Sequence, residues 1–418
     1  MARRRIALGA VLSALNSPQQ TGPGALPGYR LAARNANIAS FEVMELVKQA
    51  LALEQQGKPI IHLSIGEPDF TAPEPVLAAL ELAARSGQTG YTPALGITPL
   101  REAIARDYAT RHGITIDPRR IIVTAGASAA LTLACCALVG VGDEVLLTDP
   151  SYPCNRHFVA AFDGIPRAIP VFADTRFQMT EGLLAEHWGP STRGTLLASP
   201  ANPTGTSIPF DELARIVAFA RARGGFTLVD EIYLGLTYDG PAHTALELGE
   251  DVIVVNSFSK YFSMTGWRLG WLVVPQALVG AFEKLAQNLF ICASTLAQQA
   301  ALACFTPESG AVFEARRAEF RQRRDAIVTA MTALGFGIPV IPDGAFYLWL
   351  DCSRFGDSRL LAKRLLEEAH VSLVPGQNFG ANKPGRWMRL SYANSMDNLL
   401  EAARRIGVTL VKETDRLG

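Results

Sequence analysis

Seven short apolar runs in the middle of the chain constrain its fold more than any other feature of the sequence. Each run has five to seven residues, is rich in Val, Ile and Leu, and does not alternate polar with apolar positions. Longer segments of helical periodicity lie between them, as at 211–223. Such runs, joined by helical crossovers, predict an α/β fold with a mostly parallel seven-stranded sheet covered on both faces. The runs occupy residues 121–126, 144–149, 167–171, 195–199, 226–231, 252–258 and 269–274.

The pattern changes near Ala311, and the rest of the chain predicts a smaller α+β domain. A long arginine-rich helix over 313–334 leads to a strand over 345–351, an amphipathic helix over 358–369, and a last strand and helix over 387–406. The predicted division is a flexible extension at 1–30, a segment at 31–60 that packs on the small domain, a large domain at 61–310 and a small domain at 311–418.

Local signals predict two further helices. The first runs from Glu42 to Gln56 and has an apolar stripe along one face. The second is expected to have Thr98 as its N-cap, a proline in its first turn, and Gly113 as its stop.

The charge balance excludes several classes of partner. The chain has 39 Lys and Arg residues against 39 Asp and Glu, whereas nucleic-acid and anionic-membrane binders usually present a basic face. A hydrophobic content of 49% fits a compact enzyme or an obligate oligomer better than a disordered or scaffold protein. The six cysteines form no C-x-x-C pair and lie in apolar surroundings, which predicts reduced core residues in a cytoplasmic protein without a metal site.

Two segments resemble membrane or targeting elements. Residues 121–142 carry no charge and are long enough to span a bilayer, but Gly, Ser and Thr interrupt them. We therefore expect a buried strand followed by a buried helix. At the N-terminus, Arg3 to Arg5 precede an apolar run without an A-x-A cleavage site. A loosely ordered extension or an upstream start codon explains this better than export, which stays the alternative.

The stretch SFSKYFSMTGWRLGW at 257–271 carries the strongest chemical signal. Lys260 directly follows an apolar run, so its amine is expected at the carboxyl end of a strand, where ligands of parallel sheets bind. A partly desolvated lysine has a lowered pKa and can form a Schiff base with a carbonyl group. Ser257, Ser259 and Arg268 can together bind one anionic group. The alternative is a surface lysine beside an unrelated arginine.

Three other motifs carry weaker signals. Asp230 ends another apolar run, in VDEIY, with Tyr233 three residues on. A buried carboxylate there needs a cationic partner and could keep a heterocyclic nitrogen protonated, or it could cap the next helix. Asn202 lies in the Pro-flanked turn of SPANPTGT, where it can bond a ligand oxygen. A strand-to-helix turn at Ala127 and Ser128 is of the kind that binds phosphate through backbone N–H groups.

Together these motifs resemble those of the pyridoxal-phosphate-dependent aminotransferases of class I/II, the aspartate aminotransferase superfamily of fold type I. The matching motifs are S-x-S-K-x-x-x-M-x-G-x-R-x-G, N-P-T-G, D-E-x-Y, Y-x-P-x-x-G and M-R-L-S, which occur in the family's order between Ile38 and Ile406. The resemblance implies an enzyme that moves an amino group between an L-amino acid and a 2-oxo acid by a ping-pong Schiff-base mechanism. It also implies pyridoxal 5′-phosphate as cofactor and a homodimer with shared active sites.

The resemblance implies a role for each matching residue. Lys260 would hold the cofactor as a Schiff base and then serve as general base, while Asp230 pairs with the ring nitrogen. Arg389 would bind the substrate α-carboxylate, aided by Gly66 and Asn202. The remaining implied contacts are Ala127, Ser128, Ser257, Ser259 and Arg268 at the phosphate, Asn202 and Tyr233 at the 3′-oxygen, Tyr152 stacked on the ring, and Tyr91 at the phosphate of the neighbouring subunit.

Substrate and reaction type stay open. Some similar aspartate aminotransferases carry a lysine that reads the distal carboxylate, and Ser128 stands there in this chain, so neutral or aromatic amino acids are candidates as good as aspartate. A β-C–S lyase or decarboxylase would share the lysine, aspartate and arginine. A ligand-sensing regulator built on this fold would need a DNA-binding domain in front, and only about 30 residues precede the fold here.

Overall fold

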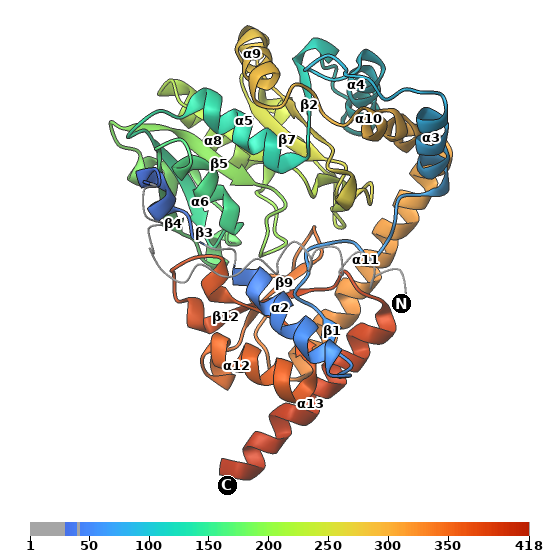
Figure 1. The fold of residues 1–418 in the computed structure, drawn as a ribbon. Helices are drawn as coiled ribbons and strands as arrows, with labels where there is room; N and C mark the ends of the chain where they lie inside the picture. The colour runs from blue at the N-terminus through green and yellow to red at the C-terminus, as the bar shows by residue number, and fades with distance from the viewer. Residues whose placement is uncertain (1–29, 40–41, 418) are drawn as a thin grey trace.

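The seven predicted runs form one sheet in the computed structural model, which describes residues 30–39 and 42–417 (Figure 1). The strands are β2 (Ile121–Thr124), β3 (Glu144–Asp149), β4 (Ile165–Pro170), β5 (Thr192–Ala198), β6 (Phe226–Asp230), β7 (Ile253–Ser257) and β8 (Gly270–Val273). Their order is β2-β8-β7-β6-β5-β3-β4. β8 is antiparallel to β2 and β7, and the other neighbouring pairs are parallel. The mostly parallel seven-stranded sheet is thus confirmed.

A second group of strands lies apart from this sheet (Figure 1). These strands are β1 (Ile61–His62), β9 (Tyr347–Asp351), β10 (Val371–Ser372), β11 (Val374–Pro375) and β12 (Trp387–Ser391). β11, β12 and β9 form an antiparallel sheet in that order, and β1 pairs with β10 in parallel. The α-helices of the described residues are α2 (Glu42–Gln55), α3 (Glu74–Arg85), α4 (Thr98–His112), α5 (Ala127–Leu138), α6 (Pro153–Ala160), α7 (Glu181–His187), α8 (Phe210–Ala222), α9 (Val279–Leu289), α10 (Thr295–Ala301), α11 (Pro307–Ala333), α12 (Ser358–Arg364) and α13 (Met396–Leu417).

Helices cover both faces of the large sheet because its strands are apolar on both sides. Val145 and Leu147 of β3 belong to a buried cluster with residues of α5 and α9. Leu146, between them, belongs to a different cluster with residues of α7 and α8. Successive side chains of a strand point to opposite faces, so a strand buried on both faces reads as a continuous apolar run.

The join between the two groups of strands is a continuous helix. The predicted boundary between residues 310 and 311 falls in the first turn of the 27-residue helix α11, which extends from beside α3 to α13 (Figure 1). The segment expected at 31–60 is divided: α2 contacts β10, but a short helix at Ala33–Asn37 contacts α6. Arg34 donates to the carbonyl oxygen of Ala161 there (3.1 Å), because the last carbonyls of a helix lack intrahelical donors. The predicted extension at 1–30 lies, apart from Arg30, outside the described residues.

Two helix predictions need correction. α4 does end at Gly113, but its N-cap is Ile97 instead of Thr98, and no side chain caps it. The N–H of Ile97 donates to the side-chain oxygen of Gln298 (2.9 Å). Gln298 lies about 200 residues further along the chain, and no local sequence signal indicates this contact. The helix predicted over 358–369 is present, although its second half, Leu365–Ala369, is a π-helical turn.

The segment at 121–142 folds as the strand β2 and the buried helix α5, as predicted. Within the described residues, no helix is long and apolar enough to cross a membrane. All six cysteines are free, and Cys135, Cys304 and Cys352 are buried.

Candidate active site

Lys260 lies just beyond the carboxyl end of β7, which is next to the central strand of the large sheet, β6. Its ammonium group donates to the carbonyl oxygen of Gly66 (2.6 Å), which brings the loop after β1 over the sheet. Burial lowers the pKa of Lys260 to about 8, and the guanidinium groups of Arg389 and Arg268 also lower it, while Glu67 and Asp230 act in the opposite direction. The amine is therefore far easier to deprotonate than an ordinary lysine.

Asp230 occupies the equivalent end of the adjacent strand, β6. Its Oδ1 accepts from the N–H of Ile232 (3.0 Å), and within the described part of the chain Oδ2 has no hydrogen-bond donor. Burial raises the pKa of Asp230 to about 6, while the bond from Ile232 and the charge of Lys260 lower it. The carboxylate is thus buried near an amine, with one oxygen free for a cationic partner.

Arg389 projects from β12 and joins the two groups of strands. Its side chain is buried (4% exposed) and donates through Nη1 to Asn202 Oδ1 (2.9 Å) and through Nη2 to the carbonyl oxygen of Ser64 (2.6 Å). Its Nε is buried without a hydrogen-bond partner, and no carboxylate pairs with it among the described residues. A buried guanidinium needs an anion, so this position is suited to a ligand carboxylate.

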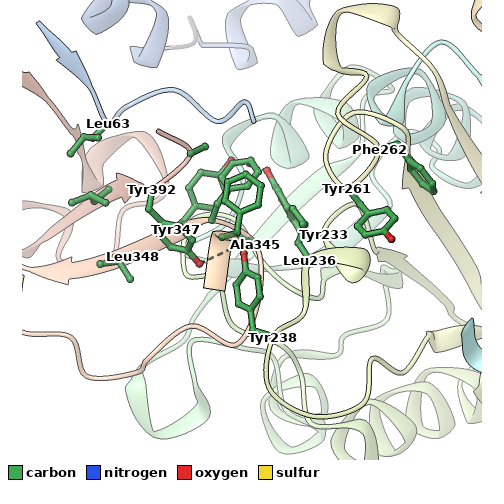
Figure 2. Close-up of a cluster of buried hydrophobic side chains, with 14 of the residues drawn as sticks. Leu63, Tyr233, Leu236, Tyr238, Tyr261, Phe262, Ala345, Tyr347, Leu348 and Tyr392 are labelled. Carbon is green, nitrogen blue, oxygen red and sulfur yellow. Dashed lines mark hydrogen bonds between the residues drawn. The ribbon is translucent and has the colours of Figure 1, made fainter. Parts of the chain in front are cut away.

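Tyr233 and Tyr347 form a hydroxyl pair between the two groups of strands (Figure 2). Their oxygens are 2.7 Å apart, and burial raises the pKa of both phenols. The Tyr347 hydroxyl also lies against Gly66, where an added Cβ would come within 2.5 Å of it. The guanidinium of Arg389 stacks over the Tyr347 ring at 4.5 Å. Tyr347 therefore touches three of the predicted site residues.

Several groups that can donate hydrogen bonds to an anion surround the N-terminus of α5. Gly126, which precedes the helix, has a φ of +85°, and a Cβ there would come within 2.7 Å of Arg268 Nη2. Ser257 Oγ donates to Ser259 Oγ (2.9 Å), and the ion pairs of the described residues do not include Arg268. The first N–H groups of a helix lack intrahelical acceptors and attract anions. The predicted phosphate residues Ala127, Ser128, Ser257, Ser259 and Arg268 thus converge on one place.

The two remaining tyrosines have different surroundings. Tyr152 is partly buried at the start of α6, and burial raises its pKa, with smaller effects from Tyr347 and Asp230. Tyr91 lies in the loop between α3 and α4 with 86% of its surface exposed, and no hydrogen bond of the described residues joins it to Lys260 or its neighbours. The structure of one chain therefore brings together every predicted site residue except Tyr91.

Two further groups at this site had no signal in the sequence. The carbonyl oxygen of Ser64 and the hydroxyl of Tyr347 both contact predicted residues. The segment around Tyr347 was expected to be a strand, but nothing in it indicated a role for the phenol. A backbone carbonyl has no sequence signal at all.

A buried, readily deprotonated lysine beside a carboxylate, an anion-binding helix terminus and a buried arginine defines an enzyme of amine chemistry that acts on carboxylates. Comparison with known proteins agrees. The model of the aminotransferase class I and II family matches residues 58–406. A valine–pyruvate aminotransferase from Mycobacterium tuberculosis is 41% identical over 378 residues, covering 90% of this chain and 97% of that protein.

Two further relatives name other substrates. A (5-formylfuran-3-yl)methyl phosphate transaminase from Methanocaldococcus jannaschii is 38% identical, covering 90% of this chain and 98% of that protein. The solved structure of aspartate aminotransferase from Thermus thermophilus with maleate is similar with a TM-score of 0.86 at 32% identity, covering 91% of this chain and all of that one. The chain belongs to the class I and II aminotransferase family. It is a fold type I aminotransferase that moves an amino group between an L-amino acid and a 2-oxo acid by a ping-pong mechanism.

Proposed function

We propose that this enzyme uses pyridoxal 5′-phosphate held at Lys260 and that its amino donors are neutral L-amino acids. The observation that carries the proposal is that the Lys260 amine lies within electrostatic reach of the Asp230 carboxylate and of Arg268, whose guanidinium adjoins Gly126 at the start of α5. This arrangement offers a nucleophile for a carbonyl, a carboxylate for a ring nitrogen and donors for a phosphate, the three groups of that cofactor.

The residues at the two ends of the site fit the phosphate and the ring nitrogen of pyridoxal phosphate. The guanidinium of Arg268 lies beside Gly126, donates to the carbonyl oxygen of Thr265 (3.0 Å) and has no ion pair among the described residues, so it is available to bind an anion. Only a residue without a Cβ at position 126 leaves the guanidinium that place. The free oxygen of Asp230 lies where it can accept from a protonated nitrogen. Tyr233 and Asn202 supply hydroxyl and amide groups on the sides of the same space.

Pyridoxal phosphate, when bound, supplies a carbonyl that condenses with amines and a ring that accepts electrons from the substrate Cα–H bond. With its pKa lowered to about 8, the Lys260 amine is neutral in a useful fraction of molecules near neutral pH. It can then remove the proton from the substrate Cα as a general base. Asp230 keeps the ring nitrogen protonated through its buried negative charge. Arg389 orients the substrate by binding its α-carboxylate in two parallel hydrogen bonds.

The preference for neutral donors rests on the charges near the site. Lys260, Arg268 and Arg389 already have roles, and the position expected for a lysine that reads a distal carboxylate is Ser128. The relative at 41% identity is named for valine and pyruvate. Those names make valine the first donor to test and pyruvate the first acceptor.

The proposal extends to assembly and location. The enzyme acts as a cytoplasmic homodimer with shared active sites, in which Tyr91 serves the phosphate of the neighbouring subunit; its exposure on the isolated chain supports this. Free cysteines support a reducing compartment. A net charge of zero favours small-molecule substrates over nucleic acid or membrane. A large domain before α11 and a small one after it complete the proposed organisation.

The test combines a cofactor assay with a substrate panel. Purified enzyme is incubated with valine, leucine, alanine, phenylalanine or aspartate, and with pyruvate or 2-oxoglutarate as acceptor. We expect borohydride to fix the cofactor to the peptide that contains Lys260, and Lys260→Ala to lower kcat by about 10²–10⁴-fold or more. Lys363→Ala, at an exposed lysine of α12, is the matched control. Protein that binds no pyridoxal phosphate contradicts the proposal, and pyruvate and ammonia formed without an acceptor indicate a lyase.

A further inference from the structure

Asp149 is a buried acid at the carboxyl end of β3 that has no part in the chemistry described above. Only 6% of its surface is exposed. Its Oδ2 accepts from the backbone N–H groups of Ala381 (2.9 Å) and Asn382 (3.1 Å), which lie more than 230 residues later, in the loop between β11 and β12. One carboxylate of the large sheet therefore holds a loop of the small one.

The loop lies very close to Asp149, and a further backbone hydrogen bond joins the two segments next to this contact. A Cβ on Gly380 would lie 1.7 Å from Asp149 Oδ1, so only glycine lets the loop come this close. The N–H of Ser151 donates to the carbonyl oxygen of Phe379 (3.0 Å). The loop and the segment after β3 are thus joined by three hydrogen bonds within a few residues.

Each side of this junction leads to a site residue. On the loop side, the Phe379 ring lies 4.9 Å from the guanidinium carbon of Arg389 and packs edge-on against Trp349 at 5.4 Å. On the sheet side, Ser151 is followed directly by Tyr152. The junction therefore connects the expected carboxylate binder to the residue expected to face the cofactor ring.

We propose that Asp149 is a positioning residue that sets the distance between Arg389 and Tyr152 by holding loop 376–382 against the end of β3. The proposal rests on the proposed function, because it concerns how substrate and cofactor are held relative to each other. Loss of the carboxylate leaves two backbone N–H groups without their acceptor, so the loop and the ring beneath Arg389 shift. Displacements of about 1 Å at a positioning group can cost roughly 100-fold in rate or binding.

The first experiment compares Asp149→Ala and Asp149→Asn with the wild-type enzyme loaded with cofactor. We expect Asp149→Ala to raise the KM for the amino donor by roughly 10-fold or more, with a smaller change in kcat and an unchanged cofactor absorbance. Asp149→Asn keeps one acceptor oxygen and should recover part of the loss. Asp143→Asn is the matched control: it lies just before the same strand, at its other end, and also accepts a backbone N–H, from Gly140.

The second experiment asks whether Asp149 acts through the loop. Phe379→Leu removes the ring beneath Arg389 and should raise the same KM, and the double variant should be little worse than the poorer single variant. A wild-type KM in Asp149→Ala would overturn the proposal, as would a fully additive double variant. If Asp149→Ala fails to fold, the KM values of Asp149→Asn, Phe379→Leu and their double variant test the proposal in the same way. Failure of wild-type enzyme to bind cofactor or transaminate would instead reject the proposed function.

Discussion

Lys260 and Arg389 are cationic side chains that fold into the interior without an ion pair among the described residues. Burying an uncompensated charge is costly, and proteins retain such groups mainly where a ligand supplies the missing charge or where a shifted pKa is useful. Within the described ranges, the contacts of Arg389 are neutral acceptors and aromatic faces, and Lys260 contacts a carbonyl oxygen. Both residues thus lower the stability of the ligand-free enzyme, and both leave a positive charge in place to bind a ligand.

This cost predicts a pH-dependent stabilisation by Lys260→Met. The folded-state pKa of Lys260 is lowered from 10.5 to about 8, so between these values the unfolded chain binds more protons and stability rises with pH. Below about pH 8 the full penalty applies. We therefore expect cofactor-free Lys260→Met to be more stable than wild type by about 1–3 kcal/mol at pH 7, with the gain disappearing toward pH 10.5.

Urea unfolding of the cofactor-free proteins at several pH values measures this difference. Lys363→Met, at an exposed position of α12, should show no such trend. A constant difference between Lys260→Met and wild type from pH 7 to 10.5 would show that the lysine is not titrating in this range.

At the scale of elements, the turn from β2 into α5 has two geometric requirements that meet at one residue. Gly126 has a φ of +85°, a backbone conformation that L side chains adopt only with strain, and it lies against the guanidinium of Arg268. The helix start and the arginine can share one anion only because no side chain separates them. The turn thus serves two needs that glycine alone meets.

Gly126→Ala should therefore lose both stability and cofactor affinity. We expect a loss of about 1–3 kcal/mol because the backbone conformation of Gly126, with φ +85° and ψ 171°, is essentially restricted to glycine. We also expect a cofactor dissociation constant raised by roughly 10-fold through displacement of Arg268. Gly113→Ala is the control, because Gly113 has a φ of +68° but open space around it, far from the site. Absorbance titration measures the cofactor affinity of both variants. Equal affinities would contradict the prediction, because they would show that the turn at Gly126 has no role in phosphate binding.

Elements also differ in how far local sequence predicts them. Five strands of the large sheet lie within the predicted runs, because burial on both faces forces an apolar run wherever such a strand occurs. β4 and β5 begin two and three residues before their runs, and the edge strand β4 is mostly exposed. The start of α4 was placed one residue late, because its first N–H is satisfied by the distant Gln298 and not by a local cap. Helix ends that depend on tertiary partners leave no local signal.

At the scale of the whole molecule, the exposure of Tyr91 leads to a test of shared active sites. If each site takes Tyr91 from one subunit and Lys260 from the other, a mixed dimer of Tyr91→Ala and Lys260→Ala chains contains one intact site. Refolding the two inactive variants together in equal amounts should then restore about a quarter of wild-type activity, since half the dimers are mixed and each has one working site. If a mixture shown to contain mixed dimers recovers no activity, Tyr91 does not contribute to the active site of the neighbouring subunit.

The sequence by itself determined the α/β class, the strands of the large sheet and the position of Lys260 and Asp230 at strand ends. These depend on periodicity and on chemistry within a few residues of chain. The tertiary structure alone decided which distant groups meet: Tyr233 with Tyr347, 114 residues apart, Arg389 with the Ser64 carbonyl, 325 apart, and Asp149 with the loop at 381–382. Such contacts follow from how sheets and loops pack, and hydrogen bonds to backbone groups do not depend on residue type, so no pattern along the chain reveals them.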